Sequence, residues 1–389
     1  MSIANWPRFL VSLVIGLALA LGLGAQALSS VSTRTAPETA ISLFPSNGLA
    51  REQLAFANFT ARVAEPDDIQ DAARSAYPVA LATLYSDPLS PKAHAILALA
   101  ADDRAARGEI LNAAAKLNRR DLSLQGLLLQ DHVAADDYAR TIETLDQILR
   151  VHPERAQEFF PVLVEALSNS ETIPLFAELL DNSSPWHVRF LAFALRQRDV
   201  LPNLARLRLR IDVENDAIDR SLIASLAGSE DVELASALYQ SITRIDMSTA
   251  NQAKLDWRSD FPPFDWRLVD EPGFRAQQSQ DGDAIELSVR PGKGGVIAAR
   301  LLNAPNGPFR INIEHRIAPA QQLRDVRLQL VCTNVAEPVF DERFSRQGDG
   351  FRIESLPNDC AYLVLAINAR AWSGRSALNG TIQSIRISQ

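Results

Sequence analysis

The stretch D-W-R-S-D-F-P-P-F-D-W-R-L, residues 256–268, divides the chain into two kinds of sequence. Before it, apolar residues recur with the 3.6-residue period of helices, and after it short runs alternate apolar and polar side chains, as strands do. The stretch itself is rich in aromatic residues and proline: Trp257, Phe261, Phe264 and Trp266 around the pair Pro262-Pro263. We therefore expect a multidomain chain, helices first and sheets second.

Two interpretations of this aromatic stretch are open. Large aromatic side chains pack domains together, and exposed ones offer a flat face to a ligand. The position between the last helix and the first strand favours a domain joint over residues 251–263, stiffened by proline and completed by Phe264 and Trp266. Trp257 and Phe261 are then expected to pack against the last helix, near Leu238 and Ile242. Trp257 also stays a candidate ligand-binding residue.

Residues 49–250 read as successive helices of roughly 10 to 18 residues, rich in alanine and leucine. Residues 84–88 are echoed at 117–121 and again at 149–153, a spacing of 32 to 33 residues. Over roughly residues 65–153 the chain resembles a degenerate tetratricopeptide repeat, although the tryptophan and tyrosine of that repeat's first helix are missing. The resemblance implies an α-solenoid with a long surface on which a protein partner binds.

One run within the helical part has an ambiguous period. Residues 204–211 read L-A-R-L-R-L-R-I, which alternates as a strand would. Helical sequence lies on both sides of this run. We therefore expect a helix here, with a strand as the alternative.

From residue 264 to residue 389, short alternating runs recur at intervals of about ten residues, separated by turn residues. This spacing predicts an antiparallel β-sandwich. A W-R-L run near the start, and a final run with Gly380, Ile382, Ile385 and Ile387, resemble jelly-roll carbohydrate-binding modules. That resemblance implies glycan binding. The pair Gln383-Ser384 stands where many such modules carry acidic residues, so a calcium site is not expected.

The N-terminal 28 residues predict a membrane anchor or a signal peptide. Residues 9–25 carry no charge and follow Arg8, which suits a short membrane helix in contact with the membrane over residues 9–28. Ala25-Gln26-Ala27 has the form of a signal-peptidase site, so cleavage near Ala27 is the alternative. In both cases the body is expected in the bacterial periplasm, tethered to the inner membrane or released from it. Residues 29–48, rich in Ser, Thr, Ala and Pro, are expected to form a flexible spacer.

The two cysteines fit an exported chain. Cys332 and Cys360 each lie at the edge of a predicted strand, and an oxidising compartment favours a disulfide between them. Two buried free thiols are the alternative. Neither cysteine has a C-x-x-C partner or a nearby histidine, so no metal is expected.

Composition and motifs argue against nucleic-acid binding and against catalysis. The formal charge of −8 lies in the part before residue 255, while basic and acidic residues nearly balance after it. The sequence holds no G-x-S-x-G, H-E-x-x-H or P-loop motif, and its five histidines are scattered. The acidic pairs at 67–68, 102–103 and 136–137 are expected at helix starts and turns. We expect a non-enzymatic protein that needs no cofactor.

The candidate ligand-binding residues are aromatic and basic. Sugar rings stack on exposed tryptophan, and Trp372 lies in the run A-R-A-W-S-G-R between Arg370 and Arg375. Trp266 lies inside an expected strand and is assigned to the core. Two function classes follow: an envelope scaffold, linked to exopolysaccharide or envelope assembly, whose solenoid holds a protein partner, and a periplasmic carbohydrate-binding protein whose jelly roll holds a polysaccharide.

Overall fold

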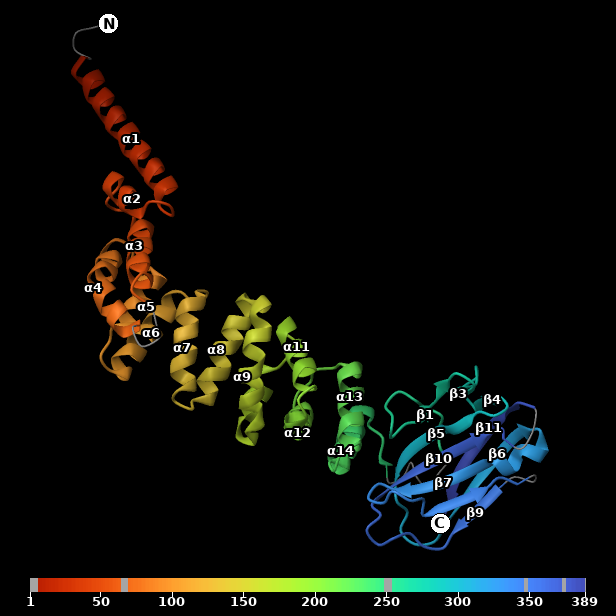
Figure 1. Ribbon diagram of the computed structural model, residues 1–389. Helices are drawn as coiled ribbons and strands as arrows, with labels where there is room; N and C mark the ends of the chain where they lie inside the picture. Colours follow the sequence, from red (N-terminus) through yellow and green to blue (C-terminus); the bar gives the residue numbers. More distant parts are fainter. Residues whose placement is uncertain (1–5, 64–68, 248–253, 346–348, 373–375, 389) are drawn as a thin grey trace. The chain divides into compact units, whose positions relative to one another are not determined.

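The computed structural model describes residues 6–63, 69–247, 254–345, 349–372 and 376–388. Helices occupy the first part of the chain and antiparallel sheets the last part, in the order that the sequence predicts (Figure 1). The chain forms two compact units, Met1–Ala166 and Leu167–Gln389. The last five α-helices therefore belong to the same unit as the sheets.

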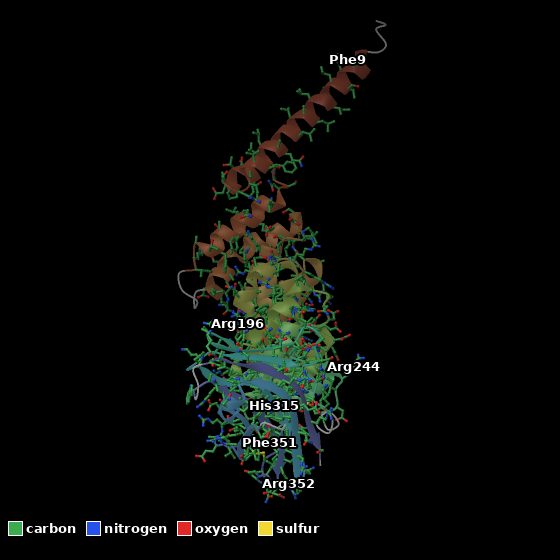
Figure 2. All side chains as sticks on the ribbon, turned by 90° about the vertical axis from the view of Figure 1, so that its right-hand side faces the viewer. Phe9, Arg196, Arg244, His315, Phe351 and Arg352 are labelled. Atoms are coloured by element: carbon green, nitrogen blue, oxygen red, sulfur yellow. A yellow bond between two sulfur atoms is a disulfide. The ribbon has the colours of Figure 1, made fainter. Side chains whose placement is uncertain are left out.

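Helix α1, Trp6–Ser32, is a single apolar helix near the N-terminus. Its segment Phe9–Ser32 has a mean hydropathy of 2.1 and is long enough to cross a membrane. In Figure 2 carbon atoms dominate the side chains along this helix from Phe9 onward. A signal sequence has the same length and composition, so both alternatives for the N-terminus fit this helix.

The expected flexible spacer over residues 29–48 is wrong. Helix α1 continues to Ser32, α2 covers Pro37–Leu43 and packs against it, and α3 begins at Gly48. The Ser29 hydroxyl donates to the Ala40 carbonyl at 2.7 Å, and the Asn47 amide donates to the hydroxyls of Ser29 and Thr33 at 2.8 and 2.9 Å. Small polar residues that suggest a linker by composition here hold the helices together.

The remaining helices of the first unit pack in sequence order. Their bounds are α3 Gly48–Thr60, α4 Ile69–Ser86, α5 Pro91–Leu99, α6 Arg104–Leu117, α7 Leu122–Val133, α8 Tyr138–Val151 and α9 Ala156–Ser168. From α2 to α8 each helix contacts the one before it, and α5 also contacts both α3 and α7. Buried alanines such as Ala73, Ala76 and Ala93 allow the helices to approach closely.

The echoed segments mark equivalent turns. Helices α4, α6 and α8 end at Ser86, Leu117 and Val151, inside or next to the three echoes. The acidic pairs serve helix starts, as expected: Asp103 and Asp137 accept the backbone N–H groups of Ala106 and Arg140 at 2.8 and 3.1 Å. The pair at 67–68 lies outside the described residues.

The second unit begins with shorter helices. Their bounds are α10 Ile173–Leu179, α11 Pro185–Ala194, α12 Leu201–Arg208, α13 Asp216–Ala227 and α14 Val232–Thr243. The alternating run at 204–211 is helical through Arg208, as expected. Two of its arginines have different surroundings. Arg206 is exposed, whereas Arg208 forms a buried ion pair with Asp219 at 2.7 Å.

Eleven described strands form two antiparallel sheets. Their bounds are β1 Arg267–Leu268, β2 Asp270–Glu271, β3 Phe274–Gln278, β4 Ile285–Val289, β5 Gly294–Asn303, β6 Phe309–Ala318, β7 Val326–Cys332, β8 Phe340–Arg343, β9 Asp349–Ile353, β10 Tyr362–Arg370 and β11 Leu378–Ser388. The five-stranded sheet has the order β1-β5-β10-β7-β8 and the six-stranded sheet the order β2-β3-β4-β11-β6-β9. Side chains of both sheets share one hydrophobic cluster, which includes Ile311, Leu328, Leu365 and Ile385.

Two features fix the ends of the sheets. Cys332 and Cys360, the expected pair, are joined by a disulfide that links the end of β7 to the segment before β10. In β11, a Cβ atom at Gly380 would collide with the backbone of Arg316 and Ile317 in β6, so only glycine allows these strands to approach.

Candidate functional site

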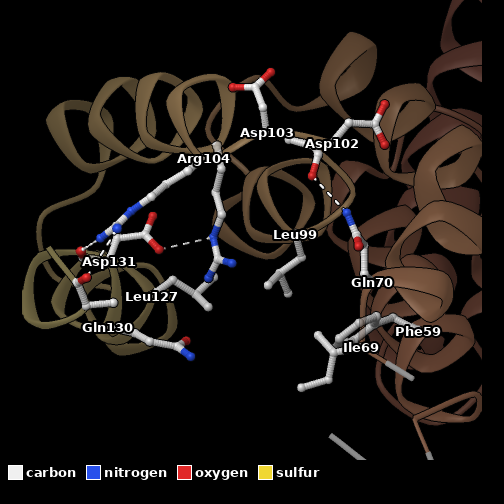
Figure 3. Close-up of a pocket in the computed structure, with 13 residues that line it drawn as sticks. Phe59, Ile69, Gln70, Leu99, Asp102, Asp103, Arg104, Leu127, Gln130 and Asp131 are labelled. Carbon is white, nitrogen blue, oxygen red and sulfur yellow. Dashed lines mark hydrogen bonds and ion pairs between the residues drawn. The ribbon is translucent and has the colours of Figure 1, made fainter. Parts of the chain in front are cut away.

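The helical part carries an open groove of about 610 Å³. It is formed by the end of α3, the start of α4, the turn from α5 to α6 and the end of α7. Three half-buried apolar side chains, Ile69, Leu99 and Leu127, come from three of these helices. Figure 3 shows Leu99 in the centre, with Leu127 on one side of it and Ile69 on the other.

One wall of the groove is held by arginines. The Arg104 guanidinium donates to the carbonyls of Asp131 and Ala134 at the end of α7, where the helix leaves carbonyl groups unpaired. The Arg107 guanidinium lies 3.4 Å from the Asp131 carboxylate, and both side chains are largely buried. These contacts fix α6 against α7, so the two arginines have a structural role.

The other wall of the groove carries the Asp102 carboxylate and the Gln70 amide. The Gln70 amide donates to the Ala101 carbonyl at 3.0 Å, which ties the start of α4 to the turn before α6. Asp102 is almost fully exposed, and its described ion pair is with the exposed Arg74, at 2.8 Å. Exposed ion pairs of this kind contribute roughly 0–1 kcal/mol, so Asp102 remains able to attract a second cation.

The sheets carry one exposed aromatic side chain among their described residues, Trp372. Trp372 is 63% exposed, and the Arg370 guanidinium carbon lies 4.5 Å from the centroid of its ring. Arg370 is held in turn, because its Nε donates to Asn368 at 3.2 Å and the Asn368 amide donates to Gln329 at 3.3 Å. A tryptophan with one face covered by arginine and polar groups beside it suits stacking against a sugar.

The other candidate ligand-binding residues are not part of this arrangement. Arg375 lies outside the described residues. Trp257 is 3% exposed, packs on Trp266 with ring centroids 5.2 Å apart and donates to the Asp283 carbonyl at 2.9 Å. The ligand-binding role expected for Trp257 is therefore wrong, because its ring has no face open to a ligand.

The joint between the last helix and the sheets includes Phe264, one of the expected residues, while Trp257 packs in the core of the sheets. Trp257 belongs to the core of the sheets, as does Trp266, and that core includes no residue of α14. Phe264 instead packs on Tyr239 of α14, with ring centroids 5.1 Å apart. The Tyr239 hydroxyl donates to the Asp265 carboxylate at 2.8 Å, and that carboxylate also accepts the Phe261 backbone N–H at 3.0 Å.

Burial and charge perturb the titrating groups of this joint. Burial raises the pKa of Tyr239, and the nearby Asp265 charge adds to the effect. Burial also opposes ionisation of Asp256, but the Arg300 and Arg258 guanidinium groups, at 2.8 and 2.6 Å, hold the pKa of that carboxyl below its ordinary value. The Asp256 carboxylate has a structural role, because it pairs with the buried Arg300 side chain.

A metal site is not visible in the described part of the chain, where no three His, Cys, Asp or Glu side chains gather closely enough to hold an ion. Two of the histidines make contacts that hold the fold together. His94 contacts the Ser90 carbonyl at 2.7 Å within α5, and His315 contacts Asp349 at 3.0 Å between β6 and β9. The first contact stabilises the start of α5, and the second holds β6 against β9.

The sequence pattern does not reveal the groove. Its residues come from five helices, α3 to α7, and no local motif brings Ile69, Leu99 and Leu127 together. The sequence offers a weak signal, because Leu99 and Gln130 are separated by nearly the 32 to 33 residues of the echoed segments and each lies at or near the end of a helix.

The fold defines a coarse class of protein: a chain with one described apolar helix near the N-terminus, a helical part and a part built of two antiparallel sheets. No protein-family model matches the sequence, and neither does any curated protein. Among solved structures, the chain is similar to TmCBM61 in complex with β-1,4-galactotriose. That similarity has 10% sequence identity and a TM-score of 0.22, and it covers 34% of this chain and 98% of the other. A likeness this distant carries no argument about ligands.

Proposed function

We propose that the protein is a non-enzymatic scaffold of the bacterial envelope, in which the helical part binds a protein partner through the groove around Leu99. The observation that carries the proposal is the groove's floor. Ile69, Leu99 and Leu127 stay partly exposed while the surrounding alanines and leucines are buried. An open apolar floor with a charged wall is the form in which helical proteins receive a partner segment.

The groove's chemistry defines the partner segment. Its floor takes an apolar side chain such as leucine, methionine or phenylalanine, and Asp102 favours a basic residue next to it. The net negative charge of the chain lies in the helical part, which favours the same partner over a longer range. The partner is therefore a protein segment with a basic residue beside an apolar anchor.

The finer fold belongs to the same proposal. The contacts of α5 with both α3 and α7 support a solenoid of tetratricopeptide type, whose paired helices form the groove. The two sheets around one shared cluster support a β-sandwich of jelly-roll type as the accessory module. Helix α1 tethers the body to the inner membrane, with the body in the periplasm.

Site-specific photo-crosslinking in cells tests the groove. We expect a benzophenone amino acid at Leu127 to trap one discrete partner, whereas the same group at Leu117 traps none. Leu117 is a matched control because it is an exposed leucine of the same unit that does not line the groove. Equal crosslinking from both positions would contradict the proposal.

The trapped partner then has to bind in purified form. Burying one leucine side chain contributes about 1.5–3 kcal/mol, so Leu127→Gln should weaken the Kd by about tenfold or more in calorimetry. Leu117→Gln should leave the Kd within about twofold. Unchanged helical content in circular dichroism shows that the loss is local, and a Kd that is the same for both variants contradicts the groove as the binding site.

Carbohydrate binding through the sheets is the second candidate function. Exposed Trp372, stacked with Arg370, supports it. A glycan array with the full chain in detergent tests this function, and Trp372→Ala should abolish retention of a bound sugar. Val335→Ala serves as the control, since Val335 is an exposed apolar residue of the same part of the chain. Absence of any retained glycan would exclude this function.

A further inference from the structure

The outer face of the six-stranded sheet is rich in arginine. Residues that point away from the shared core alternate with buried ones along β3, β6, β9 and β11. Five of the outward residues are exposed arginines, namely Arg275, Arg310, Arg316, Arg352 and Arg386. On the strands that pair here, Glu286 and Glu314 are the acidic outward residues, and at the sheet edge Asp270 of β2 lies opposite Arg275. The face around β6, β9 and β11 is therefore positively charged, although the part of the chain from residue 255 is nearly neutral.

Two of these arginines face each other. Arg310 of β6 lies directly opposite Arg352 of β9 in the strand register. Like charges at directly opposed positions destabilise a sheet. Within the described part, the Arg310 side chain makes no hydrogen bond or ion pair, and Arg352 has only the exposed Glu354, at 2.8 Å. A pair that costs stability and lacks a strong internal counter-charge indicates a site for an external anion.

The pair borders an open pocket. Arg310 and Arg352 line a concavity of about 340 Å³, together with Pro308, Phe309 and Ser388. The Ser388 hydroxyl adds a polar group at the end of β11, which pairs with β6 at Arg310. Two guanidinium groups and a hydroxyl around one pocket suit a carboxylate, because arginine binds carboxylates with two parallel hydrogen bonds.

The charge continues along the strands. Arg316 lies six residues from Arg310 on β6, which corresponds to about 20 Å at the rise of a strand. Arg386 lies on the neighbouring β11, and its described ion pair is a long contact of 3.7 Å with Glu314. Between the arginines stand polar side chains, Asn312, Thr381 and Asn379. A face of this length fits a polymer with repeated charges better than one small anion.

The face lacks what other polyanions require. Its described outward residues include no aromatic side chain on which a nucleic-acid base could stack. They also include no large apolar side chain of the kind that anchors a protein in a membrane surface. Arginines interleaved with amides and hydroxyls instead match a chain of sugars in which carboxylates alternate with hydroxyl groups.

We propose that this face, centred on Arg310 and Arg352, binds an acidic polysaccharide through its carboxylate groups. The site is separate from the groove in the helices and from Trp372. It therefore does not depend on the proposed scaffold function. It assigns the sheet part a ligand of stated chemistry, a polymer of uronic acids.

The test uses the full chain in detergent and polygalacturonate as the probe. Affinity electrophoresis at low salt should show retardation by polygalacturonate and none by dextran, which is neutral. Arg310→Gln combined with Arg352→Gln should weaken the apparent Kd by about tenfold or more, since each arginine supplies charge-assisted hydrogen bonds. Arg324→Gln, an exposed arginine of the same part of the chain outside this face, is the matched control and should change it by less than about twofold.

Several results would overturn the proposal. Equal weakening by the control variant would mean that only general charge acts. Equal retardation by dextran would mean that carboxylates are not recognised. If the protein cosedimented with phosphatidylglycerol vesicles but was not retarded by polygalacturonate, the face would instead bind a membrane surface.

A second measurement separates function from folding. Arg352→Gln removes the like-charge pair and should raise the thermal midpoint of the free protein slightly while weakening polymer binding. A variant that lost both stability and binding would indicate a structural role for Arg352 and would contradict the proposal.

Discussion

At the scale of single residues, the joint between α14 and the sheets includes one buried hydrogen bond, between Tyr239 and Asp265. Tyr239→Phe removes the hydroxyl that donates to Asp265 and leaves the packing against Phe264 intact. We expect a loss of about 1–3 kcal/mol in the free energy of unfolding, because a buried carboxylate oxygen loses its donor. Urea unfolding of the full chain measures this loss.

The control for that substitution is Tyr362→Phe. Tyr362 is half-buried in β10, and its hydroxyl makes no described hydrogen bond. We expect a change within about 0.5 kcal/mol. A loss of the same size for both variants would show that the Tyr239 hydroxyl does not stabilise the joint.

Asp256 gives a pH dependence at the same scale. Its pKa is lowered in the folded chain, so its ion pairs with Arg300 and Arg258 stabilise the fold above its unfolded pKa of about 3.8. This contribution is lost as pH falls through the lower folded pKa. Asp256→Asn should therefore be less stable than the natural protein at pH 7, and the difference should shrink below about pH 4.

Urea unfolding of both proteins at about pH 7 and about pH 3 measures this difference. Asp260→Asn is the comparison, since Asp260 is exposed and its carboxylate makes no described ion pair. A difference between Asp256→Asn and the natural protein that stays constant over this pH range would contradict the role of the ionised carboxylate.

Single residues were also where the sequence misled most. Trp257 and Trp266 occupy similar D-W-R contexts, and both rings are in the core. Nothing in the local pattern distinguishes an aromatic joint from the edge of a sheet core, because both need large apolar side chains. The arginine face, by contrast, could have been predicted, since residues 310–316 read R-I-N-I-E-H-R with polar residues at every second position.

At the scale of elements, the disulfide between β7 and the segment before β10 is expected to be a main support of the sheets. It closes a loop with a sequence separation of 28 residues, for which chain entropy gives about 3–4 kcal/mol. Replacing both cysteines by alanine should lower the free energy of unfolding by that amount. The natural protein in a strong reductant should show the same loss.

The double variant supplies the control, because reductant should not change its stability further. A natural protein whose unfolding midpoint is insensitive to reductant would show that the disulfide contributes little.

Elements were predicted more successfully than residues, for physical reasons. Strands such as β6 and β7 alternate between buried residues and more exposed ones, so the period of two can be read from the sequence. The sequence of α12 was ambiguous because an R-L-R-L run fits both the period of a strand and that of a helix. The helical sequence on both sides of it favoured a helix, and a helix is what forms. The prediction of a flexible spacer over residues 29–48 was wrong because hydrogen bonds from Ser29 and Asn47, rather than apolar burial, hold α2 in place.

At the scale of the whole molecule, helix α1 predicts how the chain fractionates. If α1 is retained as an anchor, the full chain should remain in the membrane pellet after an alkaline wash. Leu17→Arg places a charge in the middle of the apolar segment and should release the chain, at a cost to insertion of about 2.5–3.5 kcal/mol. Immunoblotting of pellet and supernatant measures the distribution.

A conservative substitution outside the apolar segment serves as the comparison. Arg34→Lys keeps the charge beyond α1 and should leave the chain in the pellet. A natural chain found entirely in the soluble periplasmic fraction, with an N-terminus near Leu28, would instead establish cleavage of the N-terminal segment.

The contact of Tyr239 with Phe264 and Asp265 has a consequence for how the molecule opens. The last helix buries Tyr239 against Phe264 and Asp265, the residues just before β1, so we expect the helix and the sheets to separate together. Residues 167–389 should then behave as one cooperative unit in hydrogen exchange, with the amides of α14 and of β5 exchanging through the same opening event. A gene fragment that begins at residue 264 would lose this shared protection, because Phe264 and Asp265 would no longer have Tyr239 as a partner.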